Sequence, residues 1–387
     1  MRSVQGEGSP LAAAHPSFFN SRSGGEFSDG VTRMSNAAAA TPIVWLLKGA
    51  KAGDYEQLRV IARALGVSAI TKQLVFRRWE LLLHAAPRPT LAGIDVEKSD
   101  ALEPPWPDLV LTAGRRNELV ARWIKERSGG RTRLVHVGRP WSHPARFDLV
   151  VSNRQYLLAA GGNVIVNDLP LTDLSEAALA ADRGDWCVRW QRLPRPWTML
   201  LVGGDTGPFV FSPAQASKLA VSVNAKMARS GGSLFVTTSG RTSPKSADAL
   251  FATLEAPAYV YRWPSKDPSP YRGFLACADD FVVTADSMSM LTEACATGRP
   301  VALFEPIDRD VPGWRNPASY RWMPFVHYVS MSLGPVRMRR DLARVHSALL
   351  ETGRIQRLGE APRKNGTSAP IGTADLARTV ERVRALL

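Results

Sequence analysis

The chain has 387 residues, of which 45% are hydrophobic and 22% charged, a composition typical of a globular protein with two or three domains. No apolar run approaches the ~18 residues of a membrane-spanning helix, so the sequence predicts none. Lysine and arginine number 49 against 35 aspartates and glutamates, and the net charge of +14 favours a polyanionic partner: nucleic acid, an anionic membrane surface or a phosphorylated small molecule. An arginine-rich surface without such a partner is the alternative.

The chain begins with a stretch that lacks periodic apolar residues. Residues 1–40 are rich in glycine, serine and alanine and contain no apolar core of a secretory signal. We interpret them as a disordered leader or as an over-long gene start, with Met34 as the alternative first residue.

Strands and helices then alternate up to residue 152. A buried strand is expected at 42–47, a glycine-containing loop at 48–54 and an amphipathic helix at 55–66. Further elements follow: strands at 67–76, 107–114, 132–138 and 147–152, and a helix at 115–130. This alternation predicts parallel β-α units in a doubly wound sheet.

The same pattern restarts near residue 198. Strands are expected at 198–202, 233–237, 258–263 and 282–285, helices at 212–232, 244–254 and 271–279, and a strand–helix–strand unit at 282–306. A Pro- and Trp-rich linker at 192–197 separates the halves, and a last amphipathic helix covers 373–387. We therefore predict an α/β protein of two Rossmann-type doubly wound parallel-sheet domains facing a cleft.

The predicted domain boundaries follow from these breaks. They are a leader at 1–40, an N-terminal acceptor domain at 41–191, the linker at 192–197, a nucleotide-sugar domain at 198–365, and a C-terminal helix region at 366–387 that packs back on the N-terminal domain.

Four polar loops follow predicted strands, where ligands bind in open parallel sheets. The first contains Gly49, Lys51, Gly53, Asp54 and Gln57 and precedes a helix, a geometry suited to anions. The next two contain Gly203, Gly204 and Thr206, and then Thr238, Ser239 and Arg241. Simple strand-to-helix turns and helix caps are the alternatives for these loops.

The fourth loop has the sequence ADSMSMLTEACATG. Asp286, Ser287, Met288 and Ser289 lie at an expected helix N-terminus, where free backbone N–H groups favour an anion. Glu293 follows within two turns, where its carboxylate is placed to accept hydrogen bonds from a ribose diol.

This fourth loop resembles the nucleotide-sugar half of GT-B glycosyltransferases, and is similar to the lipid-linked GlcNAc transferases of peptidoglycan synthesis. The resemblance implies that residues 287–289 hold a diphosphate and Glu293 the ribose. It also implies a counterpart of those enzymes' acceptor loop at residues 49–66, with Asp54 where they often carry histidine.

A wider resemblance covers the chain from Pro42 onward. The stretches GAKAGDYEQ, PDLVLTAGRRNELVARW, SGGRTRLVHVGRPW, LLVGGDTGPF and TTSGRTS resemble those of the elongated-mitochondria (Elm) fission-factor family, of which the chain is identified as a bacterial member. Plant members are implicated in recruiting the fission dynamin to mitochondria, and bacterial relatives have been described as nucleotide-sugar epimerases.

Metal-independent transfer on such a fold needs a base near the acceptor hydroxyl. Asp54 is the first candidate by position, with His143 and His136 as alternatives. The six histidines show no HxxxH or HExxH spacing, so we expect no metal site. The three cysteines, Cys187, Cys277 and Cys295, form no CxxC pair, which favours free thiols in a reducing compartment.

A membrane-facing patch is expected within residues 71–89. Phe76, Arg77, Arg78 and Trp79 combine aromatic and basic side chains, which suits an anionic bilayer. A strand followed by a short core helix is the alternative. Nucleic-acid binding is disfavoured because no RNP, helix-turn-helix or zinc signature is present.

The sequence therefore predicts a cytoplasmic enzyme, peripheral on the inner face of the membrane, that transfers sugar from a nucleotide-sugar donor to a cell-envelope glycolipid. It needs no cofactor. The alternatives are a nucleotide-sugar epimerase on the same fold and a non-catalytic adaptor of the fission-factor type. The oligomeric state is left open.

Overall fold

The computed structural model describes residues 41–49, 51–80, 83, 88–305, 320–336, 339–360 and 372–387. The leader expected at 1–40 lies outside these residues. The chain from Thr41 onward forms one compact unit. Within the described residues its strands form two six-stranded sheets in which the named strand pairs are all parallel.

The first sheet has the order β2-β1-β3-β4-β5-β6. Its strands are β1 (Val44–Lys48), β2 (Ala69–Gln73), β3 (Leu109–Ala113), β4 (Arg133–Val137), β5 (Leu149–Asn153) and β6 (Val164–Asn167). Its helices include α1 (Ala52–Leu65) and α2 (Asn117–Arg127). Gly66 ends α1 in the left-handed conformation, which a glycine adopts without steric cost.

Both faces of this sheet are buried. Val44 and Leu46 of β1 lie in a core with Leu58 and Ile61 of α1, whereas Trp45 and Leu47 lie in the core on the other face with α2. Successive side chains of a strand point to opposite faces, so a continuous apolar run such as VWLL serves both cores.

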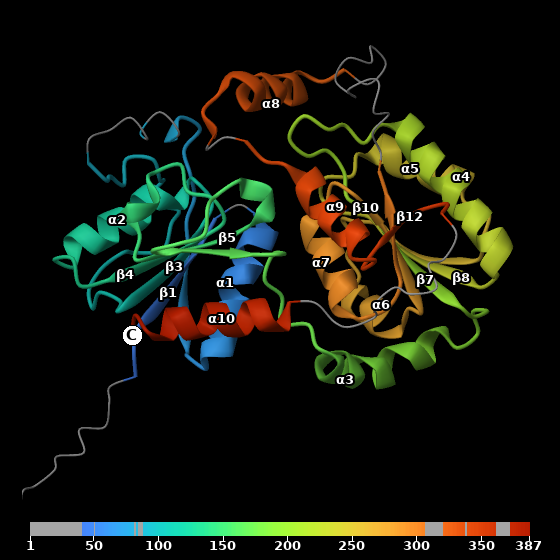
Figure 1. Cartoon of the computed structure of the whole chain (residues 1–387), viewed down its shortest axis with the longest axis horizontal. Helices are drawn as coiled ribbons and strands as arrows, with labels where there is room; N and C mark the ends of the chain where they lie inside the picture. The colour runs from blue at the N-terminus through green and yellow to red at the C-terminus, as the bar shows by residue number, and fades with distance from the viewer. Residues whose placement is uncertain are drawn as a thin grey trace, which may run out of the picture. The chain divides into compact units, whose positions relative to one another are not determined.

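The second sheet has the order β12-β11-β10-β7-β8-β9. Its strands are β7 (Trp197–Leu201), β8 (Ser233–Thr237), β9 (Ala258–Tyr261), β10 (Asp280–Thr284), β11 (Val301–Phe304) and β12 (Gln356–Arg357). Its helices are α4 (Pro213–Ser230), α5 (Pro244–Thr253), α6 (Tyr271–Cys277), α7 (Met288–Ala296) and α9 (Leu342–Glu351). One core contains α4 and α5 and the other contains α6, α7 and α9, so this sheet is also covered on both faces (Figure 1).

The predicted fold class is confirmed in its architecture: the protein is α/β, with two Rossmann-type parallel sheets. The alternation of apolar strands with amphipathic helices indicated this, because parallel neighbours need a long crossover connection, which is usually a helix. The sequence did not lead us to predict β6, α3 (Glu176–Cys187), α8 (Trp322–Leu333), α9 or β12.

The C-terminal helix α10 (Thr373–Arg384) contacts residues of the first sheet. Asn167 Nδ2 donates to Thr379 Oγ1 at 3.1 Å, and the Asp168 N–H donates to the Asp375 carboxylate at 2.8 Å. Val383 is fully buried in the core that contains α1. The domain boundaries themselves stay a prediction.

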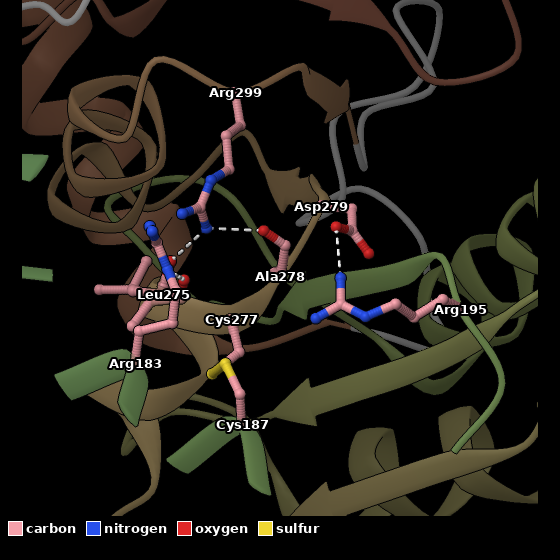
Figure 2. Close-up of a disulfide and its surroundings, with 9 residues drawn as sticks. Arg183, Cys187, Arg195, Leu275, Cys277, Ala278, Asp279 and Arg299 are labelled. Atoms are coloured by element: carbon pink, nitrogen blue, oxygen red, sulfur yellow. Dashed lines mark hydrogen bonds and ion pairs between the residues drawn. A yellow bond between two sulfur atoms is a disulfide. The ribbon is translucent and has the colours of Figure 1, made fainter. Parts of the chain in front are cut away.

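The expectation of free thiols is wrong for two of the three cysteines. Cys187 at the end of α3 and Cys277 at the end of α6 form a disulfide between positions 90 residues apart (Figure 2). The two helices pack closely: a Cβ added at Gly273 would lie 2.4 Å from Cγ of Trp186. Spacing in the sequence cannot reveal such an approach, and the free-thiol argument for a reducing compartment fails with it.

Cys295 is a buried free thiol, and burial raises its pKa to about 12. Near the disulfide, Arg299 donates to the carbonyl oxygens of Leu275 and Ala278 at 2.9 and 2.6 Å, and Arg195 pairs with Asp279 at 2.7 Å (Figure 2). None of the described helices is both long enough and apolar enough to cross a membrane.

Candidate functional site

A cavity of about 430 Å³ lies at the carboxyl ends of β1, β3 and β4. This is the edge at which open parallel sheets bind ligands. Its polar and glycine lining comes from the loops after these strands and from two later segments: Gly49, Lys51, Asp54, Gly114, Arg115, Arg116, Asn117, Gly138, Arg139, Tyr156, Arg339 and Arg340.

The lining of this cavity is strongly basic. Its cationic side chains are Lys51, Arg115, Arg116, Arg139, Arg339 and Arg340, and its carboxylate is that of Asp54. Such an excess of positive charge, concentrated in a concave surface, attracts anions more strongly than the same charges dispersed over a convex one.

Asp54 lies in the first turn of α1, against Gly114. A Cβ added at Gly114 would lie 3.2 Å from Asp54 Oδ2, and Gly114 has φ +73°, so a larger residue would be both crowded and strained. Burial raises the pKa of Asp54, whereas the charges of Lys51 and Arg340 lower it. A carboxylate with a raised pKa in a cavity has the properties of a general base.

Two interactions hold the arginine side of the cavity. The buried Glu118 carboxylate accepts the backbone N–H groups of Trp141 and Ser142 at 2.6 and 2.9 Å, which fixes the loop after β4. The Arg115 guanidinium then stacks over the Trp141 ring, 4.8 Å from its centroid.

Asn117 forms the floor of the cavity beside Gly49. Its Nδ2 donates to the carbonyl oxygens of Leu47 and Ala113 at 2.9 and 3.0 Å. Its Oδ1 is buried and accepts no hydrogen bond from any described residue. A Cβ added at Gly49 would lie 3.3 Å from this oxygen, so a larger residue at this position would crowd it.

The predicted nucleotide-sugar loops of the second sheet meet one another. The Gly203 N–H donates to Thr284 Oγ1 and the Gly204 N–H donates to Asp286 Oδ2, both at 2.8 Å. Arg241 pairs with Asp286 at 2.7 Å, and Ser239 Oγ donates to the Gly203 carbonyl at 2.9 Å. The prediction therefore selected residues that are neighbours in space, although they bond chiefly to each other.

The two glycines of this cluster allow three loops to approach closely. A Cβ at Gly203 would lie 2.1 Å from Asp286 Oδ2, and one at Gly204 would lie 2.1 Å from the Arg241 carbonyl oxygen. Thr206 forms a tight turn with Phe209, and Thr238 Oγ1 accepts the Trp263 N–H at 2.9 Å.

The N-terminus of α7 adjoins that of α1. Ser287 caps α7 without a side-chain hydrogen bond, and Met288 is buried in the core, so it has only its backbone to offer a ligand. A Cβ added at Gly53 would lie 3.1 Å from Ser289 Oγ. Both helix N-termini carry free N–H groups and the positive end of a dipole, so together they favour an anion more than either does alone.

Glu293, the predicted ribose ligand, is bonded within the chain. The Tyr271 hydroxyl donates a hydrogen bond to its carboxylate. Burial raises the pKa of Glu293 to about 7, the hydrogen bond from Tyr271 opposes that shift, and the charge of Glu56 adds to it.

The remaining candidates lie elsewhere. His143 Nδ1 accepts the Ala145 N–H at 3.3 Å and caps a short 3₁₀ turn, and His143 does not line the cavity. His136 is fully buried in β4, where burial lowers its pKa to about 3 and keeps it neutral. Gln57 Oε1 accepts the Leu171 N–H at 3.1 Å.

The expected membrane patch is partly exposed. Arg77, Arg78 and Trp79 are exposed, with Trp79 at 44%, whereas Phe76 is half-buried and contacts the core around α2. Residues 81–82 and 84–87 of the expected patch lie outside the described residues. The membrane role stays a prediction.

Sequence reasoning missed most of the basic lining. Arg115, Arg116 and Asn117 directly follow β3, and this position after a strand was a usable signal, although we treated the segment only as a helix start. Arg139 and Arg340 gave no such signal, since only the tertiary structure brings them to the cavity.

Comparison with known proteins decides the family. Residues 52–323 match the model of the family described as "Mitochondrial fission ELM1". The chain belongs to this family. The ELM1 assignment confirms the resemblance found in the sequence.

The curated relatives include the mitochondrial fission protein ELM1 of Arabidopsis thaliana, which is 29% identical over 217 residues, 50% of this chain and 51% of the relative. An uncharacterized protein of Rickettsia prowazekii is 24% identical over 234 residues, 52% of this chain and 65% of that protein. The chain thus spans about half to two-thirds of the length of these relatives.

Solved structures with a similar chain path include MurG of Acinetobacter baumannii, with 13% identity, a TM-score of 0.39, and coverage of 89% of this chain and 100% of that one. The UDP-GlcNAc 2-epimerase of Methanocaldococcus jannaschii has 11% identity, a TM-score of 0.47, and coverage of 88% and 99%. The E. coli ADP-heptose heptosyltransferase II has 11% identity, a TM-score of 0.40, and coverage of 89% and 98%.

Proposed function

We propose that the protein is a metal-independent glycosyltransferase that uses a nucleotide-sugar donor and a membrane-bound acceptor. The observation that carries this proposal is the approach of the α7 N-terminus at Ser289 to the α1 N-terminus at Gly53, one residue from Asp54. An anion site and a candidate base from different sheets are thereby adjacent, as transfer between two substrates requires.

In this proposal Asp54 accepts the proton of the acceptor hydroxyl as its oxygen attacks the anomeric carbon. The bond from that carbon to the diphosphate oxygen breaks, and the nucleoside diphosphate leaves with the electron pair. The N-terminus of α7, with Ser287 and Ser289, stabilises the charge that develops on the diphosphate.

A membrane-bound acceptor is supported by helix α8. Its Trp322, Met323 and Leu333 side chains are 63%, 59% and 84% exposed. Its His327 is near Lys51 and Arg115. Burial lowers the pKa of His327, and the positive charges of Arg115 and Lys51 lower it further. Exposed aromatic and aliphatic side chains beside cations suit the surface of an anionic bilayer.

A non-catalytic adaptor is the second candidate. It is favoured by the internal bonding of the Gly203 and Gly204 N–H groups and by the pairing of Arg241 with Asp286. A nucleotide-sugar must compete with these contacts or bind beside them.

The deciding experiment is a thermal-shift screen of the full chain with UDP-, GDP-, ADP- and CMP-linked sugars, followed by a hydrolysis and transfer assay with the stabilising sugar. We expect one nucleotide class to raise the Tm, and Asp54→Asn to abolish turnover while leaving that shift intact. No shift with any nucleotide-sugar would instead support the adaptor.

A further inference from the structure

The cavity at the carboxyl ends of β1, β3 and β4 contains two kinds of unused binding capacity. One is its basic lining, and the other is the buried Asn117 Oδ1, which accepts no hydrogen bond from any described residue. A buried acceptor without a donor is unfavourable, so a ligand that donates a hydrogen bond to it removes this cost.

The cations are arranged to bind an anion with several oxygens. Arg115 stacks on Trp141, and this contact to the face of its guanidinium orients the planar donor fork. Arg116 Nε pairs with Glu80 Oε1 at 2.6 Å, which partly neutralises the charge of this arginine. Arg340 donates through Nε to Gln155 Oε1, so its two terminal nitrogens can still donate to a ligand. Arginine forks suit phosphate because they donate two parallel hydrogen bonds.

The hydrogen-bond acceptors of the cavity require a second kind of group on the same ligand, one that donates hydrogen bonds. Asn117 Oδ1 is an acceptor, and the Asp54 carboxylate in the same lining is a second one. A bare phosphate at neutral pH offers little donor capacity, whereas the hydroxyls of a sugar or other polyol supply it.

We infer that this cavity binds a phosphorylated polyol, with the phosphate on Arg115 and the neighbouring cations and the hydroxyls on Asn117 and Asp54. Its volume of about 430 Å³ is within the range of small-ligand sites. The inference deepens the proposed function by giving the chemical class of the acceptor, and it rests on that function only for the role of the bound molecule.

The source of the polyol phosphate is either a soluble sugar phosphate or a lipid headgroup. Both present the same chemistry to the cavity. The exposed helix α8, whose His327 is near Arg115, would allow a headgroup to enter while the lipid stays in the bilayer.

Calorimetric titration of the full chain without any nucleotide-sugar tests the inference. The soluble probes are glucose 1-phosphate, glucose and inorganic phosphate. The lipid probes are phosphatidylcholine vesicles containing phosphatidylinositol, compared with vesicles containing phosphatidylglycerol at equal charge. We expect either of two results. If glucose 1-phosphate binds more tightly than glucose and inorganic phosphate, the ligand is a soluble sugar phosphate. If phosphatidylinositol vesicles bind more tightly than phosphatidylglycerol vesicles, the ligand is a lipid headgroup.

The variant Arg115→Gln should weaken this binding about ten- to a hundredfold, because a hydrogen bond to a charged group contributes roughly 1.5–3 kcal/mol. Arg189→Gln is the matched control: Arg189 stacks on Trp186 at 4.5 Å, in the segment after α3, so the same charge and the same kind of contact are lost outside the cavity. Equal losses in the two variants, or no binding of either glucose 1-phosphate or phosphatidylinositol vesicles, would overturn the inference.

The outcome is separable from that of sugar transfer. Binding that depends on Arg115 without any transfer would contradict the proposed function and leave the site standing. Transfer to an acceptor without phosphate, unaffected by Arg115→Gln, would contradict the site and leave the transferase standing.

Discussion

At the residue scale, burial rather than charge determines the protonation of the candidate groups. Desolvation is the largest contribution to the raised pKa values of Asp54 and Glu293, and it also lowers the pKa of His136. The carboxyls are thus held toward neutrality and the histidine is kept uncharged. Of these three residues, Asp54 lines the described cavity.

The pKa of Glu293 makes a testable contribution to stability. Because its pKa is about 7 in the folded chain against 4.5 as the ordinary value, the folded state binds the proton more tightly. Stability is therefore lost as pH rises from about 4.5 to 7, by on the order of 2–3 kcal/mol. Glu293→Gln should remove this dependence, so the free energy of unfolding of the variant, minus that of the wild type, should increase with pH in urea titrations.

Tyr271→Phe is the companion variant. The hydroxyl of Tyr271 lowers the pKa of Glu293, so its removal should move the pH-dependent window upward. A difference between Glu293→Gln and the wild type that does not change from pH 4 to 8 would show that the carboxyl is not desolvated.

At the element scale, the disulfide joins two helices, α3 and α6, that also pack closely against each other. Cys187 and Cys277 end these helices, and Gly273 of α6 lies against Trp186 of α3. A glycine is needed there because the indole occupies the space of a side chain. The bond and the packing thus hold a helix before β7 to one before β10.

Helix glycines in α3 and α6 should respond oppositely to substitution by alanine. Gly273→Ala should lower the free energy of unfolding by roughly 1–3 kcal/mol, because the new Cβ overlaps Trp186. Gly184→Ala, in α3 with no atom within 4 Å of the added Cβ, should raise it by about 0.5–1 kcal/mol. Chemical denaturation measures both, and equal effects would argue against this packing.

The disulfide should stabilise the chain measurably. A cross-link across 90 residues restricts the unfolded chain, and a native bond of this kind contributes about 2–4 kcal/mol. The double variant Cys187→Ser, Cys277→Ser should unfold at lower urea concentration than the oxidised wild type. Reduction with dithiothreitol should lower the wild type to the level of the variant and leave the variant unchanged; a wild type insensitive to dithiothreitol would contradict the bond.

At the scale of the whole molecule, part of the net charge of +14 lies in the basic cavity, whose lining has six cationic side chains and the carboxylate of Asp54. The basic cavity and α8 are neighbours, because His327 of α8 is near Lys51 and Arg115 of the cavity. A dispersed positive surface would bind polyanions without selectivity, whereas this arrangement pairs a concave cationic site with an apolar contact surface.

We expect vesicle binding to depend on both the basic cavity and the exposed side chains of α8. Met323→Asp with Leu333→Asp replaces two exposed side chains of α8, so it should reduce sedimentation with phosphatidylglycerol-containing vesicles severalfold without changing the Tm. Val221→Asp with Val188→Asp, at positions 58% and 61% exposed elsewhere, is the control for added negative charge. Loss of binding in the control to the same degree would mean that net charge alone drives the association.

The fold could be predicted from the sequence to a large extent. Apolar runs such as VWLL and LLVGG, separated by amphipathic helices, determine parallel sheets, since strand burial and helix periodicity are local properties of the chain. The loops at strand ends were also predictable, and Gly203, Ser239, Arg241 and Asp286 do come together. Each of these residues follows a strand of the same parallel sheet, and this position in the sequence was sufficient to predict that they lie close together.

The composition of the cavity was decided only by the tertiary structure. Arg139 and Arg340 are 201 positions apart in the sequence. Both line the cavity, because the loop after β4 and the segment before α9 lie at the same edge of the first sheet. The bond between Cys187 and Cys277 arises in the same way, from two helices that are far apart in the sequence and pack directly against each other. The sequence by itself determined the sheets and the family, because these depend on local patterns; contacts between distant segments depend on how the elements pack, and no local pattern encodes them.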